Sequence, residues 1–566
     1  MYRHNNVIGR DLAGGARRLA VAAWLAFVLG SSLFAADAYQ PKPQPPTDGH
    51  VGSNYTPAYA VNQVQFWHDF RPDVVEQELA AARKHFGMST LRVFLHDINF
   101  FEEKESLLKN LETFLTICDR HEIKPGFVFF DGCHRHEGIY LDKPTKPVPG
   151  FHNSRWAQSP QARHIEPDNL EKFKPYVQEI IRKYRADDRV LFWEIHNEPP
   201  PGDAYRDRLK RAGFEWAKEV KPIQPILNCE KGQRGWADCE VTDIVDAHQY
   251  QHNYGPLDYL SEANSQKGTV FTEAGARWKL RIRNFGDPCE LIHWLEGRKH
   301  RGKSTPGVYL CWELMVGNSN CRWHWRDTGY SRGEPDPEPE IPWCGLLWPD
   351  CTPVSLAEAE AIRRYRIGKS HALLYSNFEH SSEGWMPAKA ERLQVVNALH
   401  LPAGGMATAG DAAWTDYVVE TTIALQPQGD EAGQAGVVLR ATTGDGAADK
   451  LRGYAVTLDT QKQLRLSKLA AGNNCDLASY DLTNLATATR LGEWSMLRVA
   501  VDGPRIRVWC NRSHQSSDPE RGLRIDYTDQ DEPIRNGGIG VYTQGVKAMF
   551  DNVVVLPIDA LPVPAE

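Results

Sequence analysis

The feature that most constrains the fold is a regular alternation of short apolar strands with amphipathic helices over the first two thirds of the chain. Strand-like runs start near His50, Leu91, Gly126, Val190, Pro225, Ile244, Val270 and Gly307. Apolar residues at helical spacing occupy residues 72–86, 107–121, 170–184, 205–220 and 357–367. This order predicts an α/β protein with a parallel sheet. Eight repeats favour a closed (β/α)8 TIM barrel over an open doubly wound sheet.

The fourth predicted strand ends in a carboxylate. Residues 190–200 read Val-Leu-Phe-Trp-Glu-Ile-His-Asn-Glu-Pro-Pro, and the apolar run stops at Asn197 and Glu198 before two prolines that cannot continue a strand ladder. In a parallel barrel, the carboxyl ends of the strands carry the chemistry. Glu198 is therefore the first catalytic candidate, although a bare Asn-Glu-Pro tripeptide is equally consistent with a surface turn.

A second strand repeats this arrangement. Residues 267–275 read Lys-Gly-Thr-Val-Phe-Thr-Glu-Ala-Gly, which places Glu273 at the end of a short β-rich run. If both strands belong to one barrel, the two glutamates converge at its mouth, as the acid/base and nucleophile of a glycosidase must. No Gly-x-Gly-x-x-Gly follows the first strand, which argues against dinucleotide binding.

Five elements, in chain order, resemble the signature of a known enzyme clan. They are Arg92 in Leu-Arg-Val-Phe, Asn197-Glu198-Pro199, His248-Gln249-Tyr250, Thr272-Glu273, and Trp312 in Tyr-Leu-Cys-Trp. Together they resemble the clan A retaining glycoside hydrolases, and most closely family 5, the cellulase-like enzymes. The resemblance spans residues 48–368, and five elements in the right order are far more specific than any one alone.

The resemblance implies a role for each of these residues. Glu198 would be the acid/base and Glu273 the nucleophile of a retaining mechanism that passes through a glycosyl-enzyme intermediate. Glu198 must be neutral to donate a proton, so we expect burial and the charge of Glu273 to raise its pKa, whereas Glu273 must stay ionised. Arg92 would keep Glu273 charged, because an arginine in an apolar strand is costly without an anion nearby. Tyr250 would hydrogen-bond the nucleophile, and His248 would shape the acid/base site.

Further residues are expected to support the substrate. Trp312 would stack on the sugar at the cleavage point, and Asn197 would hold its 2-hydroxyl group. Asp131 and His134 end the third strand, where sugar contacts are expected, although the family has an aromatic residue where this chain has His134. About half of the loop tryptophans are expected to line subsites. These are Trp67, Trp156, Trp278, Trp323, Trp325 and Trp343. Glu194 and Glu230 are nearby acids that mutagenesis could mistake for the catalytic pair.

The pattern of apolar and polar residues changes from about residue 373. Short alternating strands separated by Gly, Asn and Asp turns replace the helical pattern, for example at 436–440, 454–458, 497–501 and 506–509. This predicts an all-β sandwich over residues 371–566. Trp494, the stretch 503–509, and the stretch 538–541 leading to 550–552 resemble concanavalin-like jelly-roll modules, which implies a carbohydrate-binding module or a domain that only supports the barrel.

The first 38 residues have the features of an export signal. Arg10, Arg17 and Arg18 precede an apolar stretch at residues 19–34, and Ala36-Asp37-Ala38 is a small-x-small cleavage site. The apolar stretch is shorter than the ~20 residues of a spanning helix, so we expect no membrane segment in the mature protein. Residues 39–48 form a proline-rich leader, and residues 49–370 the catalytic domain. We therefore predict an exported protein.

Composition narrows the partners and cofactors. The formal net charge of −8 gives no basic surface for nucleic acid. No Cys-x-x-Cys pair combined with a His-x-x-x-His cluster, the spacing of structural zinc sites, is present, so neither a metal in the catalytic domain nor another cofactor is expected. An exported protein can form disulfides, and the 11 cysteines include four pairs close in sequence. These are Cys229/Cys239, Cys311/Cys321, Cys344/Cys351 and Cys475/Cys510.

The sequence predicts a monomeric retaining β-glycoside hydrolase that acts on a polysaccharide or oligosaccharide. Glucans, mannans, xylans and galactans all stay candidate substrates, because loop shape decides among them. The alternative is a non-catalytic carbohydrate-binding or scaffolding protein that has kept the barrel.

Overall fold

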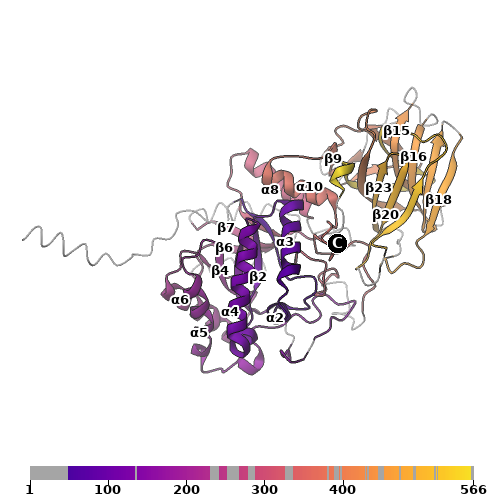
Figure 1. Ribbon diagram of the computed structural model, residues 1–566. Helices are drawn as coiled ribbons and strands as arrows, with labels where there is room; N and C mark the ends of the chain where they lie inside the picture. Colours follow the sequence, from indigo (N-terminus) through magenta and orange to yellow (C-terminus); the bar gives the residue numbers. More distant parts are fainter. Residues whose placement is uncertain are drawn as a thin grey trace, which may run out of the picture. The chain divides into compact units, whose positions relative to one another are not determined.

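The chain is seen in a computed structural model, shown in Figure 1. It describes residues 49–561, apart from residues 134–136, 144, 230–240, 251–266, 278–286, 326–334, 379–380, 388–393, 396–397, 428, 430–431, 444–450, 471–472, 488–491, 515–517 and 519. The predicted export signal and leader therefore lie outside the described residues, as do His134, Glu230, Cys239 and Trp278.

Eight parallel strands form the predicted barrel. They are β1 (Val51–Asn54), β2 (Thr90–Phe94), β3 (Lys124–Asp131), β4 (Phe192–Asn197), β5 (Ile226–Leu227), β6 (Val245–Gln249), β7 (Thr269–Ala274) and β8 (Gly307–Leu310). Strand β1 pairs with both β2 and β8. Pairing between neighbours continues from β2 to β5 on one side and from β8 to β6 on the other, so β5 and β6 are the two ends of the sheet. There the backbone N–H of Asp243 donates to the carbonyl of Ile226 over 2.8 Å and continues the ring. Every predicted strand start lies within two residues of an observed one, which confirms the TIM barrel.

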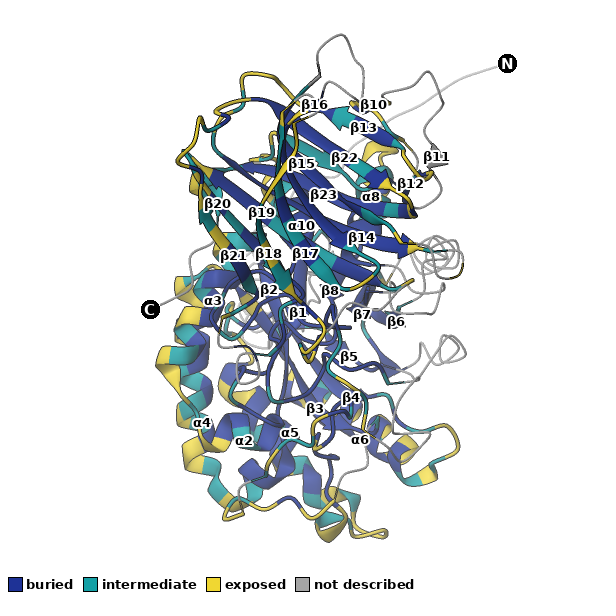
Figure 2. Cartoon of the chain, turned by 90° about the vertical axis from the view of Figure 1, so that its right-hand side faces the viewer, coloured by how far each residue is buried: buried dark blue, intermediate teal, exposed yellow. Residues whose placement is uncertain are grey.

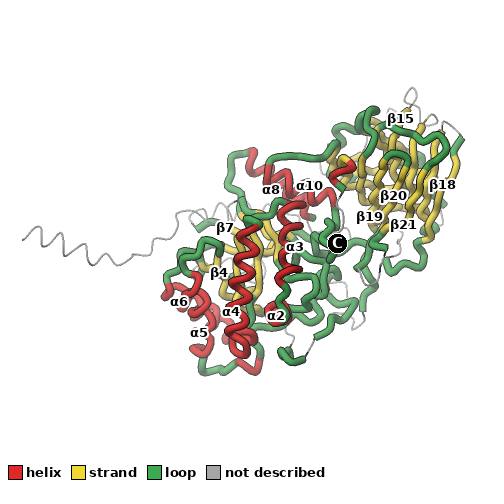
Figure 3. The backbone as a smooth tube through the Cα atoms, in the orientation of Figure 1, coloured by secondary structure: helices red, strands yellow, loops and turns green. Residues whose placement is uncertain are grey.

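Helices surround these strands, as Figure 3 shows in red around yellow. They are α2 (Gln63–His68), α3 (Pro72–Phe86), α4 (Asp97–Arg120), α5 (Lys174–Tyr184), α6 (Ala204–Val220), α8 (Pro288–His300) and α10 (Leu356–Ile367), with short 3-10 turns at Ala162–His164, Leu170–Phe173 and Ile558–Ala560. Helix α4 starts ten residues before its predicted start, because its first turns continue across a non-helical Glu103. Among the described helices, none combines the length and the apolarity that a bilayer crossing needs.

Helix α8 was not predicted from the sequence. Its buried residues include the consecutive run from Pro288 to Ile292, so its first turn faces protein on every side instead of showing one apolar stripe. Figure 2 shows that the other outer helices differ from this turn, because they carry yellow exposed patches around dark-blue buried strands.

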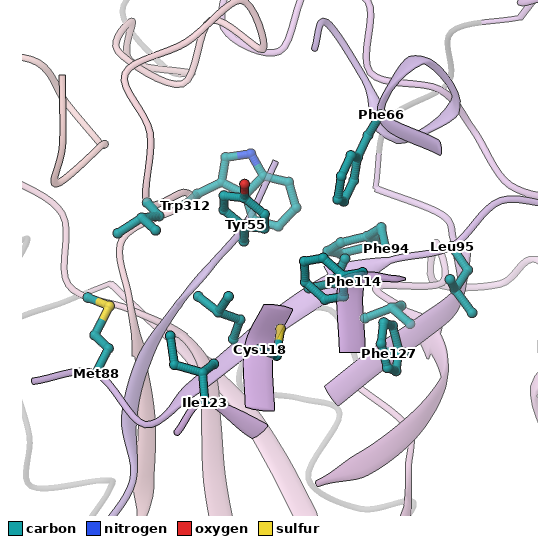
Figure 4. Close-up of a cluster of buried hydrophobic side chains, with 14 of the residues drawn as sticks. Tyr55, Phe66, Met88, Phe94, Leu95, Phe114, Cys118, Ile123, Phe127 and Trp312 are labelled. Carbon is teal, nitrogen blue, oxygen red and sulfur yellow. The ribbon is translucent and has the colours of Figure 1, made fainter. Parts of the chain in front are cut away.

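Aromatic and aliphatic side chains share the core between the strands and the helices. Figure 4 shows Tyr55, Phe114 and Trp312 in this cluster, together with aliphatic side chains and Cys118. One glycine makes part of this packing possible. A Cβ on Gly126 of β3 would lie 2.2 Å from the ring of Phe192, so only glycine admits that ring.

The second part of the chain is an all-β sandwich, as predicted. One antiparallel sheet contains, in spatial order, β10 (Met386–Pro387), β13 (Met406–Ala409), β22 (Gly538–Gln544), β15 (Gln434–Thr443), β16 (Leu451–Asp459), β17 (Gln463–Ala470) and β18 (Cys475–Asp481). The other contains β11 (Gln394–Val395), β12 (Leu399–Leu401), β23 (Lys547–Pro557), β14 (Tyr417–Gln426), β19 (Trp494–Asp502), β20 (Arg505–Cys510) and β21 (Leu523–Thr528), with β9 (Leu374–Ser376) beside β23. The four sandwich segments predicted above lie in β15, β16, β19 and β20.

Helix α10 contacts the sandwich directly. The Oε1 atom of Glu420 on β14 accepts hydrogen bonds from the backbone N–H of Leu356 over 2.6 Å and from the Ser355 hydroxyl over 3.0 Å. Arg498 on β19 donates to the other oxygen of Glu420 over 2.9 Å. The first N–H groups of a helix lack hydrogen-bond acceptors within it. Here a carboxylate of the sandwich accepts the hydrogen bond of such a group at the start of a barrel helix.

The cysteines within the described residues are thiols. The predicted pairs Cys311/Cys321, Cys344/Cys351 and Cys475/Cys510 are therefore not formed, and Cys229/Cys239 includes a residue that the structure does not describe. Proximity in sequence is a poor guide here, because Cys311 lies against Cys344 on a separate segment instead of against Cys321.

Candidate active site

The two predicted catalytic glutamates lie at the same end of the barrel. Glu198 follows the last residue of β4, and Glu273 is the fifth residue of β7. One carboxylate oxygen of each, together with a ring nitrogen of His248, lie within 4.8 Å of one another. Glu198 has a φ of +40°, in the left-handed region, and strained backbone of this kind persists where the surrounding structure enforces it. The barrel therefore brings together two carboxylates that are 75 residues apart in the sequence.

Arg92 organises the floor of this site. Its side chain is fully buried, and its Nε and one terminal nitrogen bind both oxygens of Glu194 over 2.8 and 2.6 Å. The other terminal nitrogen donates to Glu273 over 3.0 Å and to Asn54 over 2.9 Å. Burial alone would lower the pKa of the Arg92 guanidinium, but the carboxylates of Glu194 and Glu273 raise it well above its usual range. The predicted contact with Glu273 is present, and Glu194 is a partner that the sequence analysis missed.

Glu273 receives three donors. Beside Arg92, the Tyr250 hydroxyl donates to its Oε2 atom over 2.6 Å, and Nδ1 of His248 lies 3.3 Å from the same oxygen. Burial raises the pKa of Glu273 to about 7 despite the opposing charges of His248 and Arg92, whereas we expected Glu273 to stay ionised. Burial and the charge of Glu273 raise the pKa of Tyr250 far enough for its hydroxyl to stay a donor. Both oxygens of Glu273 are thus held by donors.

His248 bridges the two glutamates. Its Nδ1 atom lies 2.6 Å from Oε1 of Glu198 and 3.3 Å from Oε2 of Glu273, and the register of β6 and β7 places it opposite Glu273. Burial would lower the pKa of His248, but the two carboxylates raise it to about 9. The imidazole is therefore cationic near neutral pH. The sequence analysis expected it to act on Glu198 alone.

Asn197 and Asp131 support the site from below. The Asn197 amide oxygen accepts a hydrogen bond from Arg92 over 2.7 Å, and its nitrogen donates to Asp131 over 2.9 Å. Asp131 also accepts the indole N–H of Trp156 over 2.7 Å. Both Asn197 and Asp131 are buried, and these contacts position Arg92 and Trp156, while the sugar contacts expected from the two residues stay a prediction.

Trp312 lies two residues after the end of β8. It is 5% exposed and packs edge-on against Trp156 and Phe94, with ring centroids 5.1 and 5.4 Å apart. Trp325 packs against Tyr250 at 4.9 Å, so Trp156 and Trp325 are both loop tryptophans that contact site residues. Trp343 lies behind Trp325.

Trp67 and Trp323 lie elsewhere. Trp67 was expected to contact substrate, but it is fully buried, donates to the Phe94 carbonyl over 2.7 Å and stacks on Phe66. Helix α2 turns this side chain into the core, because an apolar ring of that size is stabilised more by burial than by exposure. Trp323 is covered by the Arg322 guanidinium at 3.7 Å.

Two groups within the described residues could hold a metal ion. One is Glu198, His248 and Glu273 themselves, and the other is Cys229, Asp246 and His248. The second escaped the sequence analysis because its donors come from a segment after β5 and from β6, so no short spacing joins them.

Comparisons with known proteins follow the division into two parts. Residues 376–556 match the family model described as a 3-keto-alpha-glucoside-1,2-lyase-like domain. The structure is similar to an exo-beta-1,4-mannosidase from Opitutaceae bacterium strain TAV5, with 15% identity over 58% of this chain and 63% of that chain and a TM-score of 0.39. It is also similar to a GH5_18 protein from Streptomyces cattleya, with 13% identity over 59% of this chain and 82% of that chain and a TM-score of 0.39.

A third solved structure is also similar to part of this chain. This is the carbohydrate binding module CBM66 from Bacillus subtilis, with 18% identity over 31% of this chain and 95% of that chain and a TM-score of 0.24. None of the curated proteins matches the sequence. The concanavalin-like character of the sandwich stays a prediction.

Proposed function

We propose that the protein is a retaining β-glycoside hydrolase in which Glu198 is the acid/base and Glu273 the nucleophile. One observation carries the proposal. An oxygen of Glu198 and an oxygen of Glu273 lie within 4.8 Å of each other at the carboxyl ends of β4 and β7. Retaining enzymes hold the two carboxyl groups about 5 Å apart, whereas inverting enzymes need roughly 6.5–9.5 Å to admit a water molecule between them.

The surroundings of the two carboxylates support this assignment of roles. Arg92 and Tyr250 each hold one oxygen of Glu273, which stabilises its anion and aims it, as a nucleophile requires. Both side chains keep a small exposed fraction, 12% for Glu198 and 8% for Glu273. Glu273 would attack the anomeric carbon while Glu198 gives its proton to the glycosidic oxygen.

The second half of the reaction uses the same groups in reverse. Glu198, now a carboxylate, takes a proton from water as that water displaces Glu273 from the sugar. Once Glu273 is esterified it carries no charge, so the cation of His248 is left to Glu198 alone. His248 would therefore stabilise Glu198 as an anion in the state in which it must accept a proton.

The substrate we propose is a β-linked polysaccharide or oligosaccharide, met outside the cytoplasm by an exported enzyme. The face of Trp312 offers a stacking surface for a sugar ring. Its indole N–H is buried and has no partner in the part of the chain that the structure describes, so a sugar hydroxyl can accept it.

The proposal is tested by kinetics on aryl β-glycosides of several sugars. Glu273→Gln should lower kcat by about 10³-fold or more, because the glutamine cannot form the ester. Glu198→Ala should keep the first step on substrates with an acidic phenol leaving group and accumulate the glycosyl-enzyme, and azide should then release a β-glycosyl azide. Glu171→Gln, on the barrel surface, is the matched control and should retain wild-type rates.

Two outcomes would contradict the proposal. If the wild type is as inactive as Glu273→Gln on every β-glycoside yet still binds sugar, the chain is a binding protein on a glycosidase barrel. If the first product detected by NMR has the inverted anomeric configuration, the two-step mechanism is wrong.

A further inference from the structure

A second set of functional groups lies beside the proposed catalytic pair. The Cys229 thiol, a carboxylate oxygen of Asp246 and a ring nitrogen of His248 lie within 4.8 Å of one another. Cys229 and Asp246 are buried, and the His248 side chain is only 3% exposed. None of the catalytic steps above uses Cys229 or Asp246. A thiol, a carboxylate and an imidazole together are the donor types that proteins use for zinc.

His248 has one nitrogen left for such a role. Its Nδ1 atom faces Glu198 and Glu273, whereas its Nε2 atom is buried and has no hydrogen-bond partner in the described part of the chain. A buried polar atom without a partner costs stability, so its presence calls for an explanation. Coordination of a metal ion by Nε2 would supply the missing partner.

The neighbouring groups are arranged as they are around bound metals. A metal-bound histidine commonly has a carboxylate on its other nitrogen, and Glu198 is already 2.6 Å from Nδ1. Asp246 is fixed by Thr272, whose hydroxyl lies 2.8 and 2.6 Å from its two oxygens. Four carboxylates lie around one guanidinium and one imidazole here. They are those of Glu194, Glu198, Asp246 and Glu273.

We propose that Cys229, Asp246 and His248 bind a divalent transition-metal ion, with Zn²⁺ as the best match, and that this ion inhibits the hydrolase. Zinc lies about 2.0–2.3 Å from such ligands, so the three donor atoms must approach to somewhat under 4 Å of one another. That requires side-chain movements of about 1 Å from the present separations. Binding releases the thiol proton of Cys229 and the Nε2 proton of His248, and a water molecule completes the tetrahedron.

The inhibitory half of this proposal rests on the proposed function, whereas the binding half does not. An ion on Nε2 of His248 places a dication beside the imidazole that lies 2.6 Å from Glu198 and 3.3 Å from Glu273. Its charge opposes the positive charge that develops on the sugar as the glycosidic bond breaks. Metal binding and hydrolysis can therefore be measured separately, and failure of one is distinguishable from failure of the other.

Binding is tested on the full chain, reduced and then freed of metals with a chelator. Cd²⁺ is the probe, because its thiolate complex has a charge-transfer absorption in the ultraviolet. The wild type should bind one Cd²⁺ with this band, and both Cys229→Ser and Cys229→Ala should lose it. Cys118→Ser, which removes an equally buried thiol in α4, is the matched control and should keep the band. Asp246→Asn should weaken binding about 10- to 100-fold.

Inhibition is tested with Zn²⁺ on the same proteins, each compared with its own metal-free rate. Zn²⁺ should lower kcat/KM of the wild type and of Cys118→Ser at least tenfold, with recovery on adding chelator, and should not affect the Cys229 variants. The proposal is overturned if the Cys229 variants keep the Cd²⁺ band, or if they stay as sensitive to Zn²⁺ as the wild type. A wild type without the band also overturns it, whatever its activity.

Discussion

Each part of the molecule has a fully buried arginine, and the two differ in their partners. Arg92 in the barrel bonds only to side chains, those of Asn54, Glu194, Asn197 and Glu273. Arg440 on β15 of the sandwich donates to the backbone carbonyls of three separate loops and to the Asp416 carboxylate. The three loop residues are Thr415, Gly503 and Ile534.

The difference shows what a buried charge does in each place. Carbonyls cannot change their protonation state, so Arg440 can only hold loops together around the register shift between β15 and β22. The carboxylates around Arg92 can gain or lose a proton or a covalent bond during a reaction. Burial accordingly lowers the pKa of Arg440, whereas the carboxylates raise that of Arg92. The charge of Arg92 is thus neutralised by groups that can take part in a reaction, whereas that of Arg440 holds backbone segments in place.

The largest expected effect separates the two arginines. Arg92→Lys keeps the positive charge but cannot reach Glu194, Glu273 and Asn197 at once, because an ammonium lacks the planar fork. We expect kcat/KM on aryl β-glycosides to fall by about 10³-fold. Arg440→Lys is the matched variant, and it should lower the melting temperature while kcat/KM stays within about twofold of wild type. Equal losses of activity in both variants would contradict the assignment of a catalytic role to Arg92 and a structural role to Arg440.

A smaller effect is expected from the tyrosines that accompany these arginines. Tyr250→Phe removes one donor to Glu273 and should lower kcat/KM by about 10- to 100-fold, the range expected for a hydrogen bond to a charged group. Tyr417 has a similar place in the sandwich, where its hydroxyl accepts from the Arg440 N–H over 2.6 Å and donates to the Gly538 carbonyl over 2.9 Å. Tyr417→Phe should reduce stability in urea by about 1 kcal/mol and leave turnover unchanged.

The smallest effect on turnover concerns a buried carboxylate of the barrel that lies outside the site. Glu78 accepts the Tyr55 hydroxyl over 2.7 Å and the Ala58 N–H over 3.0 Å, and burial raises its pKa from 4.5 to about 7. The folded protein therefore holds this proton between those pH values while the unfolded chain loses it. Stability should fall as pH rises from 4.5 to 7, by on the order of 2 kcal/mol from Glu78.

Glu78→Gln removes that titration. The fall in melting temperature between pH 4.5 and pH 8 should shrink in this variant, while kcat/KM should change little because Glu78 does not contact the catalytic pair. An unchanged pH dependence of the melting temperature would mean that Glu78 ionises normally in the folded state.

Much of the barrel was predictable because each strand and most helices carry a local periodicity. Glu198 and Glu273 were found for the same reason, since each ends a recognisable strand. Glu194 lies on the same strand as Glu198, but only the cross-barrel contact with Arg92 reveals its role. Cys229 and Asp246 likewise acquire a role only when β5 and β6 lie side by side. Trp67 was misassigned because sequence cannot say whether a tryptophan turns toward a ligand or into the core.

The contact between Glu420 and helix α10 has a practical consequence for separating the two domains. A truncated barrel that ends near residue 372 would lose the acceptor for the Leu356 N–H and uncover Leu356 and Ala357, which pack against Val418 and Val554. Helix α10 would then begin without the Glu420 carboxylate that accepts its first hydrogen bond in the whole chain. Loss of polysaccharide binding by such a fragment would then mix two causes, so single substitutions on the sandwich surface are the cleaner way to ask whether that domain recognises glycans.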